Sequence, residues 1–289
     1  MSGFPKQKRP TNMRVLGDWV REYADQQQMA ESRVRRAVSF MLVALPLEHS
    51  LDGDGKPLFA VKGGVSMELR LGLRARTTKD FDAVFRGTFE GWLAALDDAL
   101  ADDIEEFSFS REEPEAIRDT KSFRVNIIID FKGKRWGKVQ FEVAPVEVSS
   151  VLDVDQVDPF DIGQFGLRAP GQISVVGLPY LIAQKLHACT EVLEGEENAR
   201  VHDLMDLLLA RELLAPEDLR RVREACTAIF DNRQKQTWPP QLTVYRSWAE
   251  TYARLADEEG VPVGDVEEAA SLVGEFIAEI DAAANWNFR

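Results

Sequence analysis

The stretch from Lys62 to Asp82 limits the fold more than any other part of this chain of 289 residues. An apolar run from Pro57 to Val61 leads into the pair Gly63-Gly64. A short segment with the apolar spacing of a helix follows, and a second extended run carries two aspartates. The order strand, glycine turn, helix, strand is therefore predicted for this stretch.

Each part of this stretch has a chemical use. Gly63 and Gly64 allow positive φ and a close approach of the backbone to a ligand, and Ser66 stands where a helix N-terminus offers N–H groups to phosphates. Asp80 and Asp82 are two residues apart, so an extended strand presents both carboxylates on one face. A hard divalent cation relieves their repulsion, and Mg²⁺ is commonly held by carboxylates plus phosphates. The pattern indicates a metal and nucleotide site; an ordinary glycine turn before an acidic edge strand is the alternative.

A β-hairpin is predicted further on, with arms at 123–131 and 136–148. Apolar and polar residues alternate in the second arm, which places Glu142 on the polar face. Glu142 is the candidate for a third acid that acts as base toward an attacking hydroxyl, and Glu147 is the competing choice. An ordinary solvent-facing glutamate fits either position equally well.

A lysine stands out in the helical second half of the chain. Lys185 lies on the apolar stripe of a predicted helix, four residues after Leu181 and four before Cys189. A buried ammonium group is costly unless it meets an anion. Two interpretations remain open: its four-carbon stem carries the charge to solvent, or the charge reaches the phosphates of a nucleotide.

An aspartate gives the same signal in the next predicted helix. Asp206 lies in a run that is otherwise apolar from Leu204 to Ala210, where it needs a cation or hydrogen-bond donors. Asp203 lies one turn earlier and is interpreted as a helix-stabilising residue, although the two can exchange roles. His187 and His202 lack the spacing of a zinc site, so we interpret them as structural.

The charge balance argues against nucleic-acid binding over the whole surface. The chain carries 35 basic and 49 acidic residues, a net charge of −14, whereas such binding relies on Lys and Arg to neutralise phosphates. Any RNA contact must therefore be local. Two basic clusters are candidates, each with a solvated face as the alternative: Arg70, Arg74, Arg76 and Lys79, and Lys132, Lys134, Arg135 and Lys138.

Length and composition predict two domains and a cytoplasmic location. The chain exceeds one average domain, no run approaches the roughly 20 apolar residues of a membrane span, and no apolar secretory segment follows the N-terminus. Cys189 and Cys226 are expected to be buried thiols. We expect a core at 1–150, a connection at 151–175 and, at 176–289, a helical domain that completes the active site.

Several phrases of the sequence resemble a known family. G-G-V-S, followed after thirteen residues by D-F-D, is similar to the core motif of polymerase-β-type nucleotidyltransferases. V-K-G-G-V-S-M-E-L-R and R-T-T-K-D-F-D, with L-P-Y-L-I-A-Q-K-L-H-A and H-D-L-M-D-L further on, resemble the AbiEii/AbiGii toxins, especially the MenT-like mycobacterial branch. The resemblance implies an α+β fold, with a mixed sheet in the nucleotidyltransferase core and a largely helical C-terminal domain.

The resemblance also implies an activity. Toxins of this branch transfer nucleotides from an NTP to the 3′ end of transfer RNA, with Mg²⁺ or Mn²⁺, and so block aminoacylation and translation. Position by position, the family's essential lysine and aspartate fall on Lys185 and Asp206. Lys62 and Lys79 flank the central motif and are expected to join the nucleotide site. Transfer to a protein hydroxyl and a non-catalytic nucleotide-binding module are the alternatives.

The resemblance further implies regulation by a partner. A cognate antitoxin, kinase-like in part of the family, neutralises these toxins, and no membrane partner is expected. Thr78 matches the hydroxyl residue that is phosphorylated just before D-x-D. A phosphate there adds about −1.5 to −2 charges beside Asp80 and would compete with nucleotide for the metal.

Overall fold

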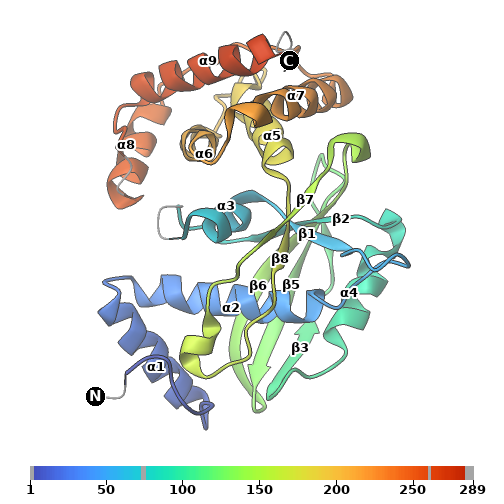
Figure 1. Cartoon of the computed structure of the whole chain (residues 1–289), viewed down its shortest axis with the longest axis vertical. Helices are drawn as coiled ribbons and strands as arrows, with labels where there is room; N and C mark the ends of the chain where they lie inside the picture. The colour runs from blue at the N-terminus through green and yellow to red at the C-terminus, as the bar shows by residue number, and fades with distance from the viewer. Residues whose placement is uncertain (1–2, 73–75, 260–261, 284–289) are drawn as a thin grey trace. The chain divides into compact units, whose positions relative to one another are not determined.

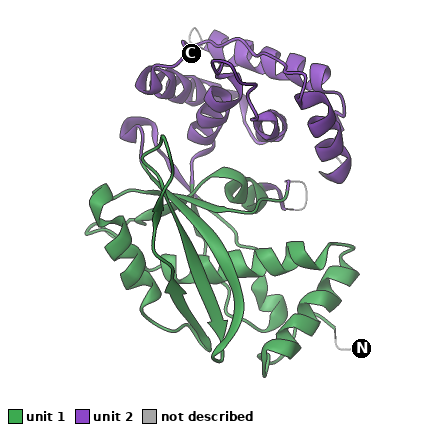
Figure 2. Cartoon of the chain, turned by 180° about the vertical axis from the view of Figure 1, so that it is seen from behind, with its two compact units in different colours: residues 1–70, 77–145, 156–175 green, residues 71–76, 146–155, 176–289 purple. Residues whose placement is uncertain are grey.

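The structure, a computed structural model, describes residues 3–72, 76–259 and 262–283. The chain divides into two compact units (Figure 2). Each unit is assembled from three separate stretches of sequence. Unit 1 contains residues 1–70, 77–145 and 156–175, and unit 2 contains residues 71–76, 146–155 and 176–289.

Unit 1 contains a mixed β-sheet with helices packed on it (Figure 1). Its helices are α1 (Met13–Gln26), α2 (Glu31–Leu47), α3 (Gly63–Leu71) and α4 (Trp92–Leu100), with short helical turns η2 (Phe89–Gly91) and η4 (Ile162–Phe165). Its strands are β1 (Phe59–Val61), β2 (Phe81–Phe85), β3 (Phe107–Arg111), β4 (Glu115–Ala116), β5 (Phe123–Phe131), β6 (Lys134–Pro145), β7 (Val154–Val157) and β8 (Ile173–Val176). The sheet order is β3-β5-β6-β2-β1-β8-β7, and β4 pairs with β5. Strand β2 is parallel to β6 but antiparallel to β1, which confirms the predicted mixed sheet.

Helix α2 covers one face of this sheet. It contacts β5 and β6, and its Phe40 meets Phe81 of β2 edge to face, with 5.5 Å between the ring centroids. Phe81 stacks in turn on Phe141 of β6 at 5.8 Å. Phe81 is buried, whereas its neighbours Asp80 and Asp82 are half-buried. Because successive residues of an extended chain point to opposite faces, these two acids lie on the face opposite α2.

Strands β5 and β6 form the predicted hairpin. Its turn uses Lys132 and Gly133, which both have positive φ, at 49° and 71°. Two-residue hairpin turns favour this conformation because its twist matches that of the strands. The apolar residues of β6, Val139, Phe141 and Val143, are buried, so the polar residues between them occupy the other face.

The segment 151–175 differs from the connection that the sequence predicts. Glycine and proline interrupt it, yet the structure places β7 and β8 in the sheet of unit 1, with Val175 paired in parallel with Val61. Each of these strands is only four residues long. Strands this short contain too few residues to show an apolar alternation in the sequence.

Unit 2 is largely helical, as predicted. Its helices are α5 (Leu178–Thr190), α6 (Val201–Arg211), α7 (Leu219–Arg233), α8 (Trp248–Glu259) and α9 (Val266–Ala282), with turns η3 (Ser149–Val151) and η5 (Pro216–Asp218). Helix α5 packs on α6 and α7, and α9 packs on α6, α7 and α8.

Cys189 and Cys226 are buried free thiols, which confirms their interpretation. In the described part of the chain, no helix has the length and apolarity needed to cross a membrane.

Candidate nucleotide and metal site

The glycine pair fits closely against the acidic strand. Strand β1 ends at Val61, and α3 begins at Gly63, whose φ is +63°. A Cβ atom on Gly63 would overlap the Asp82 carboxylate, and one on Gly64 would lie 2.7 Å from the Thr78 Cβ. Glycine is therefore needed at both positions, and the close fit sets the N-terminus of α3 beside the acids.

Asp80 and Asp82 lie on the same face of the sheet. Asp82 belongs to β2, and Asp80 stands in the bend that immediately precedes this strand. The Lys62 backbone N–H donates to the Asp82 carbonyl oxygen at 2.8 Å, which ties the end of β1 to the acidic segment. This bond and the pairing of Val61 with Ala83 hold the glycine turn beside Asp82.

The carboxyl group of Asp80 is in an electrostatically unfavourable position. Burial raises its pKa above the usual value, and the negative charge of Glu142 raises the pKa further, against the opposing effects of Arg124 and Lys79. The repulsive neighbour is thus an acid on the adjoining strand. A cation bound to Asp80 would relieve this repulsion.

Glu142 lies beside the acid pair on β6, where it is paired in register with Asp82. Arg124 of β5 donates to Glu142 Oε1 from Nε at 2.8 Å and from Nη2 at 2.6 Å. Gln140 Nε2 donates to the same oxygen at 3.2 Å and to Asp80 Oδ1 at 2.5 Å. A chain of polar contacts therefore runs from Arg124 through Glu142 and Gln140 to Asp80. Neither Arg124 nor Gln140 is predicted from the sequence to belong to this site.

Glu147, the competing third acid, has different surroundings. It belongs to unit 2, where Arg233 donates to its carboxylate from Nε and Nη2, each at 2.7 Å. Gln184 Nε2 donates to the same carboxylate at 2.8 Å. These contacts attach Glu147 to helices α5 and α7, whereas Glu142 is the glutamate in register with Asp82.

The donor set suits a hard divalent cation. Carboxylate oxygens are the ligands that Mg²⁺ and Mn²⁺ prefer. Among the residues that the structure describes, no three His, Cys, Asp or Glu side chains gather to hold a metal ion by themselves. Mg²⁺ is commonly held by one or two carboxylates, with phosphates completing its coordination. Asp80 and Asp82 therefore fit a metal that also binds a phosphate ligand.

The unit that contains the glycine turn also contains Lys62, Ser66 and Lys79, which are expected at the nucleotide site, and Thr78, the expected phosphorylation site, whereas Lys185 belongs to unit 2. Ser66 is fully buried in the first turn of α3, and its Oγ accepts a hydrogen bond from Arg70 Nη1 at 2.5 Å. Thr78 is 7% exposed, and its Oγ1 donates to the Asp80 carbonyl oxygen at 3.5 Å. Lys79 is exposed and Lys62 is half-buried. All four belong to unit 1.

The basic residues of the hairpin are largely balanced by acids. A solvated, charge-neutralised face describes this cluster better than an RNA site, since phosphate binding needs a surplus of positive charge. In the other cluster, Arg74 lies outside the described residues, and Arg76 belongs to unit 2. The hairpin ion pairs are Lys132–Glu106 at 2.9 Å, Arg135–Asp130 at 2.8 Å and Lys138–Glu112 at 3.5 Å.

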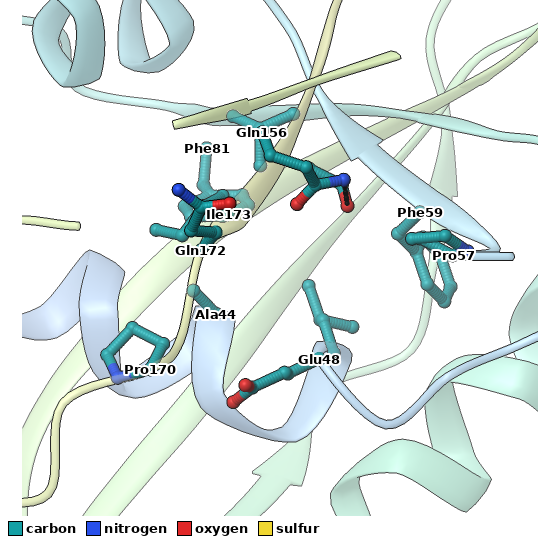
Figure 3. Close-up of a pocket in the computed structure, with 12 residues that line it drawn as sticks. Ala44, Glu48, Pro57, Phe59, Phe81, Gln156, Pro170, Gln172 and Ile173 are labelled. Carbon is teal, nitrogen blue, oxygen red and sulfur yellow. Dashed lines mark hydrogen bonds between the residues drawn. The ribbon is translucent and has the colours of Figure 1, made fainter. Parts of the chain in front are cut away.

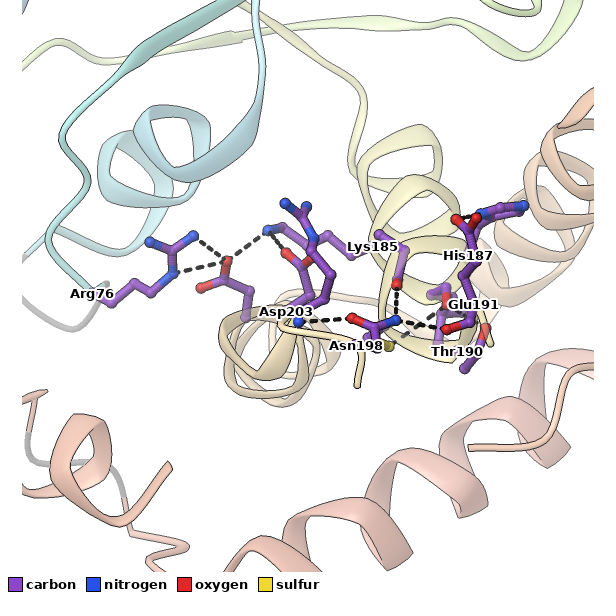
Figure 4. A network of polar contacts seen from close by, with 12 residues as sticks. Arg76, Lys185, His187, Thr190, Glu191, Asn198 and Asp203 are labelled. Carbon is purple, nitrogen blue, oxygen red and sulfur yellow. Dashed lines mark hydrogen bonds and ion pairs between the residues drawn. The ribbon is translucent and has the colours of Figure 1, made fainter. Parts of the chain in front are cut away.

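Lys185 forms the centre of a buried charge cluster in unit 2 (Figure 4). Its Nζ donates to Asp203 Oδ1 at 2.8 Å and to Asp206 Oδ2 at 2.6 Å. Arg76 Nε and Nη2 approach the same Asp206 oxygen at 3.2 Å, and Arg200 Nε donates to Asp203 at 2.7 Å. The Lys185 side chain is 6% exposed, so its charge meets anions inside the unit and does not extend to solvent.

The cluster is electrostatically coupled. Burial lowers the pKa of Lys185, but the carboxylates of Asp203 and Asp206 outweigh it and raise the pKa above the usual value. Burial likewise raises the pKa of Asp203, but Lys185 and Arg200 outweigh it and hold the pKa low. Asp206 Oδ1 is buried, and none of the described residues forms a hydrogen bond with it. Asp203, interpreted from sequence as a helix-stabilising residue, is therefore as close a partner of Lys185 as Asp206.

The two histidines near this cluster have lowered pKa values. Burial, followed by the positive charge of Arg233, lowers the pKa of His187 to about 4. Its ring packs against Phe230 at 4.9 Å between centroids. Burial is also the main cause that lowers the pKa of His202. Both are therefore neutral near pH 7.

A cavity of about 180 Å³ in unit 1 lies apart from the acids (Figure 3). Ala44 and Glu48 at the end of α2, Phe59 on β1 and Ile173 on β8 help to line it. Phe81 also lines it, so the cavity is on the face that α2 covers, opposite Asp80 and Asp82. The acid pair therefore does not open into this cavity.

Comparisons with known proteins agree with the fold and the motifs. The family model described as Nucleotidyl transferase AbiEii toxin, Type IV TA system, matches residues 47–282. No curated protein matches the chain. Among solved structures, MenT4, a nucleotidyltransferase toxin from Mycobacterium tuberculosis, is 15% identical, with a TM-score of 0.55 over 94% of this chain and 97% of that one. JHP933 from Helicobacter pylori is 17% identical, with a TM-score of 0.44 over 86% of this chain and 91% of that one. The similarity to MenT4 shows a shared fold.

Proposed function

The chain belongs to the AbiEii family of nucleotidyltransferase toxins of type IV toxin–antitoxin systems, and on this premise we propose that it adds nucleotides to the 3′ end of transfer RNA. Nucleotidyltransferases use an NTP and generally a divalent metal, here Mg²⁺ or Mn²⁺. Modified transfer RNA is no longer aminoacylated, so translation in the cytoplasm stops. The close fit of the glycine turn against Asp82, with Asp80 and Glu142 on the same sheet face, carries this proposal.

The triphosphate binds at the N-terminus of α3. Gly63 and Gly64 bring the backbone close to the phosphates, and the first residues of the helix supply N–H groups and a partial positive charge. Ser66 supports this turn from inside, because it is fully buried and its N–H donates to the Lys62 carbonyl oxygen at 3.4 Å. Lys62 and Lys79 add positive charge on either side. This arrangement uses the backbone as the main phosphate ligand, in line with the acidic character of the chain.

Asp80 and Asp82 would hold the metal, which when bound would neutralise charge on the triphosphate. The 3′-hydroxyl oxygen of the RNA attacks the α-phosphorus, its proton passes to the Glu142 carboxylate, and pyrophosphate leaves with the bonding electrons. Gln140 orients Asp80 through its 2.5 Å hydrogen bond. The protein's contribution to this chemistry is mostly positioning and charge.

Lys185 and Asp206 are assigned as the essential lysine and aspartate of the family motifs, and within unit 2 the Lys185 ammonium group is paired with both Asp203 and Asp206. Burying a lysine with two aspartates costs free energy of desolvation, and buried charged groups of this kind are enriched at functional sites. Asp206 Oδ1, which has no hydrogen-bond partner in the described part of the chain, can accept from a further donor. These features support the role that the family motifs give to both residues.

Thr78 is assigned as the phosphorylation site through which a cognate antitoxin, kinase-like in this proposal, inactivates the toxin. Its side chain packs against Gly64, and its hydroxyl lies 3.5 Å from the Asp80 carbonyl oxygen. A phosphate of about −1.5 to −2 charges there would repel the acid pair and displace the glycine turn. Because Thr78 is 7% exposed, the modifying enzyme must reach it in an opened form of its loop.

One assay tests the reaction and its substrate together. The purified chain is incubated with Mg²⁺, total transfer RNA and each labelled NTP in turn, and the RNA and protein pools are separated afterwards. Label at the 3′ end of RNA, absent with Asp80→Asn, is the expected result. Label in the protein pool alone would assign a protein hydroxyl as the acceptor. Nucleotide binding without any transfer would contradict the proposed enzymatic activity.

Replacing Gly63 with alanine is expected to lower the transfer rate by about a hundredfold or more, because its Cβ would displace the Asp82 carboxylate and small misplacements in a site are costly. Gly133→Ala is the matched control: its φ is also positive, at +71°, but nothing lies within 4 Å of its added Cβ. It should melt at a lower temperature yet keep its transfer rate. Equal losses of rate in both variants would contradict the role of the Asp82 contact.

A further inference from the structure

Three hydrogen-bond donors contact one oxygen of the Glu142 carboxylate. Arg124 Nε and Nη2 lie 2.8 and 2.6 Å from Oε1, and Gln140 Nε2 lies 3.2 Å from the same oxygen. Charge-assisted bonds from one guanidinium are both strong and directional. Together the three contacts fix the rotamer of Glu142 within the sheet.

Arg124 also acts on the acids beyond its direct partner. The Glu142 oxygen that binds the guanidinium also accepts from Gln140 Nε2, which donates to Asp80 Oδ1 at 2.5 Å as well, and Glu142 is paired in register with Asp82. The guanidinium thus already compensates part of the negative charge that would attract a metal ion. Among the described residues, no third ligand of the types His, Cys, Asp or Glu joins the pair.

We propose that Arg124 is a positioning residue that acts as a counter-ion to the acids of the site. Its ion pair fixes the position of Glu142. Its positive charge also weakens the binding of a free divalent ion to Asp80 and Asp82. A triphosphate supplies the oxygen ligands and the negative charge that this arrangement lacks. The site therefore takes up metal together with nucleotide in preference to the free ion. This inference rests on the proposed metal role of the two aspartates.

Mn²⁺ binding to the full chain, measured by calorimetry without nucleotide, tests the inference. Arg124→Ala should tighten binding about fivefold to tenfold, because one positive charge a few ångströms from a divalent ion is removed in a water-like dielectric. Arg124→Lys keeps the charge and should bind Mn²⁺ nearly as the wild type does. With a non-hydrolysable NTP present, wild type and Arg124→Ala should differ less than twofold.

Arg111→Ala is the matched control. Arg111 is another arginine of unit 1 that holds a carboxylate with two bonds, to Asp97 at 2.6 and 2.9 Å, and Asp97 belongs to α4. Its removal should leave Mn²⁺ binding unchanged. Equal tightening in Arg111→Ala, or none in Arg124→Ala, would overturn the inference and leave the proposed function standing. With the non-hydrolysable NTP present, wild type and Asp80→Asn that bind Mn²⁺ equally would instead refute the metal role itself.

Discussion

Asp80→Asn is expected to reduce nucleotidyl transfer by about a thousandfold or more without loss of the fold, because one of two carboxylates for the metal is removed. The asparagine Oδ1 can still accept the Gln140 hydrogen bond of 2.5 Å. Loss of the charge also relieves the repulsion from Glu142 that raises the Asp80 pKa. The melting temperature should therefore stay level or rise while the initial rate of labelled nucleotide incorporation falls to background.

Asp130→Asn provides the control for that experiment. Asp130 is an aspartate of the same unit whose partner is Arg135, at 2.8 Å on the outer part of the hairpin. Exposed ion pairs of this kind contribute little to stability, so both rate and melting temperature should match the wild type. An Asp80→Asn protein that kept a tenth of the wild-type rate would rule out Asp80 as a metal ligand.

Lys185→Met is expected to lower the free energy of unfolding by about 3–5 kcal/mol, the usual cost of removing one partner from a buried ion pair. Asp203 and Asp206 would lose their central cation, and their side chains are only 3% and 0% exposed. Denaturant unfolding followed by the helical circular dichroism signal measures this. Lys235→Met, at a lysine 60% exposed and paired with Glu191, should change stability by less than about 1 kcal/mol.

A compensated variant separates stability from chemistry at Lys185. Adding Asp203→Asn to Lys185→Met removes one of the two buried carboxylates that lost the lysine and leaves Asp206 with Arg76, 3.2 Å away. The double variant should regain part of the lost stability. Transfer should remain absent, since the lysine that the family motif makes essential is still missing. Recovery of transfer in step with stability would assign Lys185 a purely structural role.

The local structure of residues 62–82 can be predicted from the sequence, because each of its features depends on neighbouring residues. A glycine pair, a short amphipathic helix and acids at i and i+2 each depend on a few neighbouring residues. The buried charges at Lys185 and Asp206 are also predictable, because each interrupts an apolar stripe. What periodicity cannot supply is the partner: that Lys185 would meet Asp203 as well depends on how α5 and α6 pack together.

The contact between Arg124 and Glu142 shows why Arg124 cannot be assigned to the site from the sequence. Counting from the hairpin turn pairs Phe131 with Lys134, and the same count carried along the strands would set Arg124 opposite Phe141. The register shift at Ile129/Asp130 moves the partner by one residue, to Glu142. A β-bulge of this kind reverses which face a pair shares, and no residue type in the sequence marks it unambiguously.

The interleaved division of the chain constrains how such proteins can be engineered. The helical unit uses residues 71–76 and 146–155 as well as everything from 176 onward, so a single cut isolates neither half as an intact piece. Chimaeras between distant relatives would have to exchange matched segments at several crossover points at once. Deletion series from either end should accordingly yield insoluble fragments, and domain swapping by simple fusion is a poor route to altered specificity in this architecture.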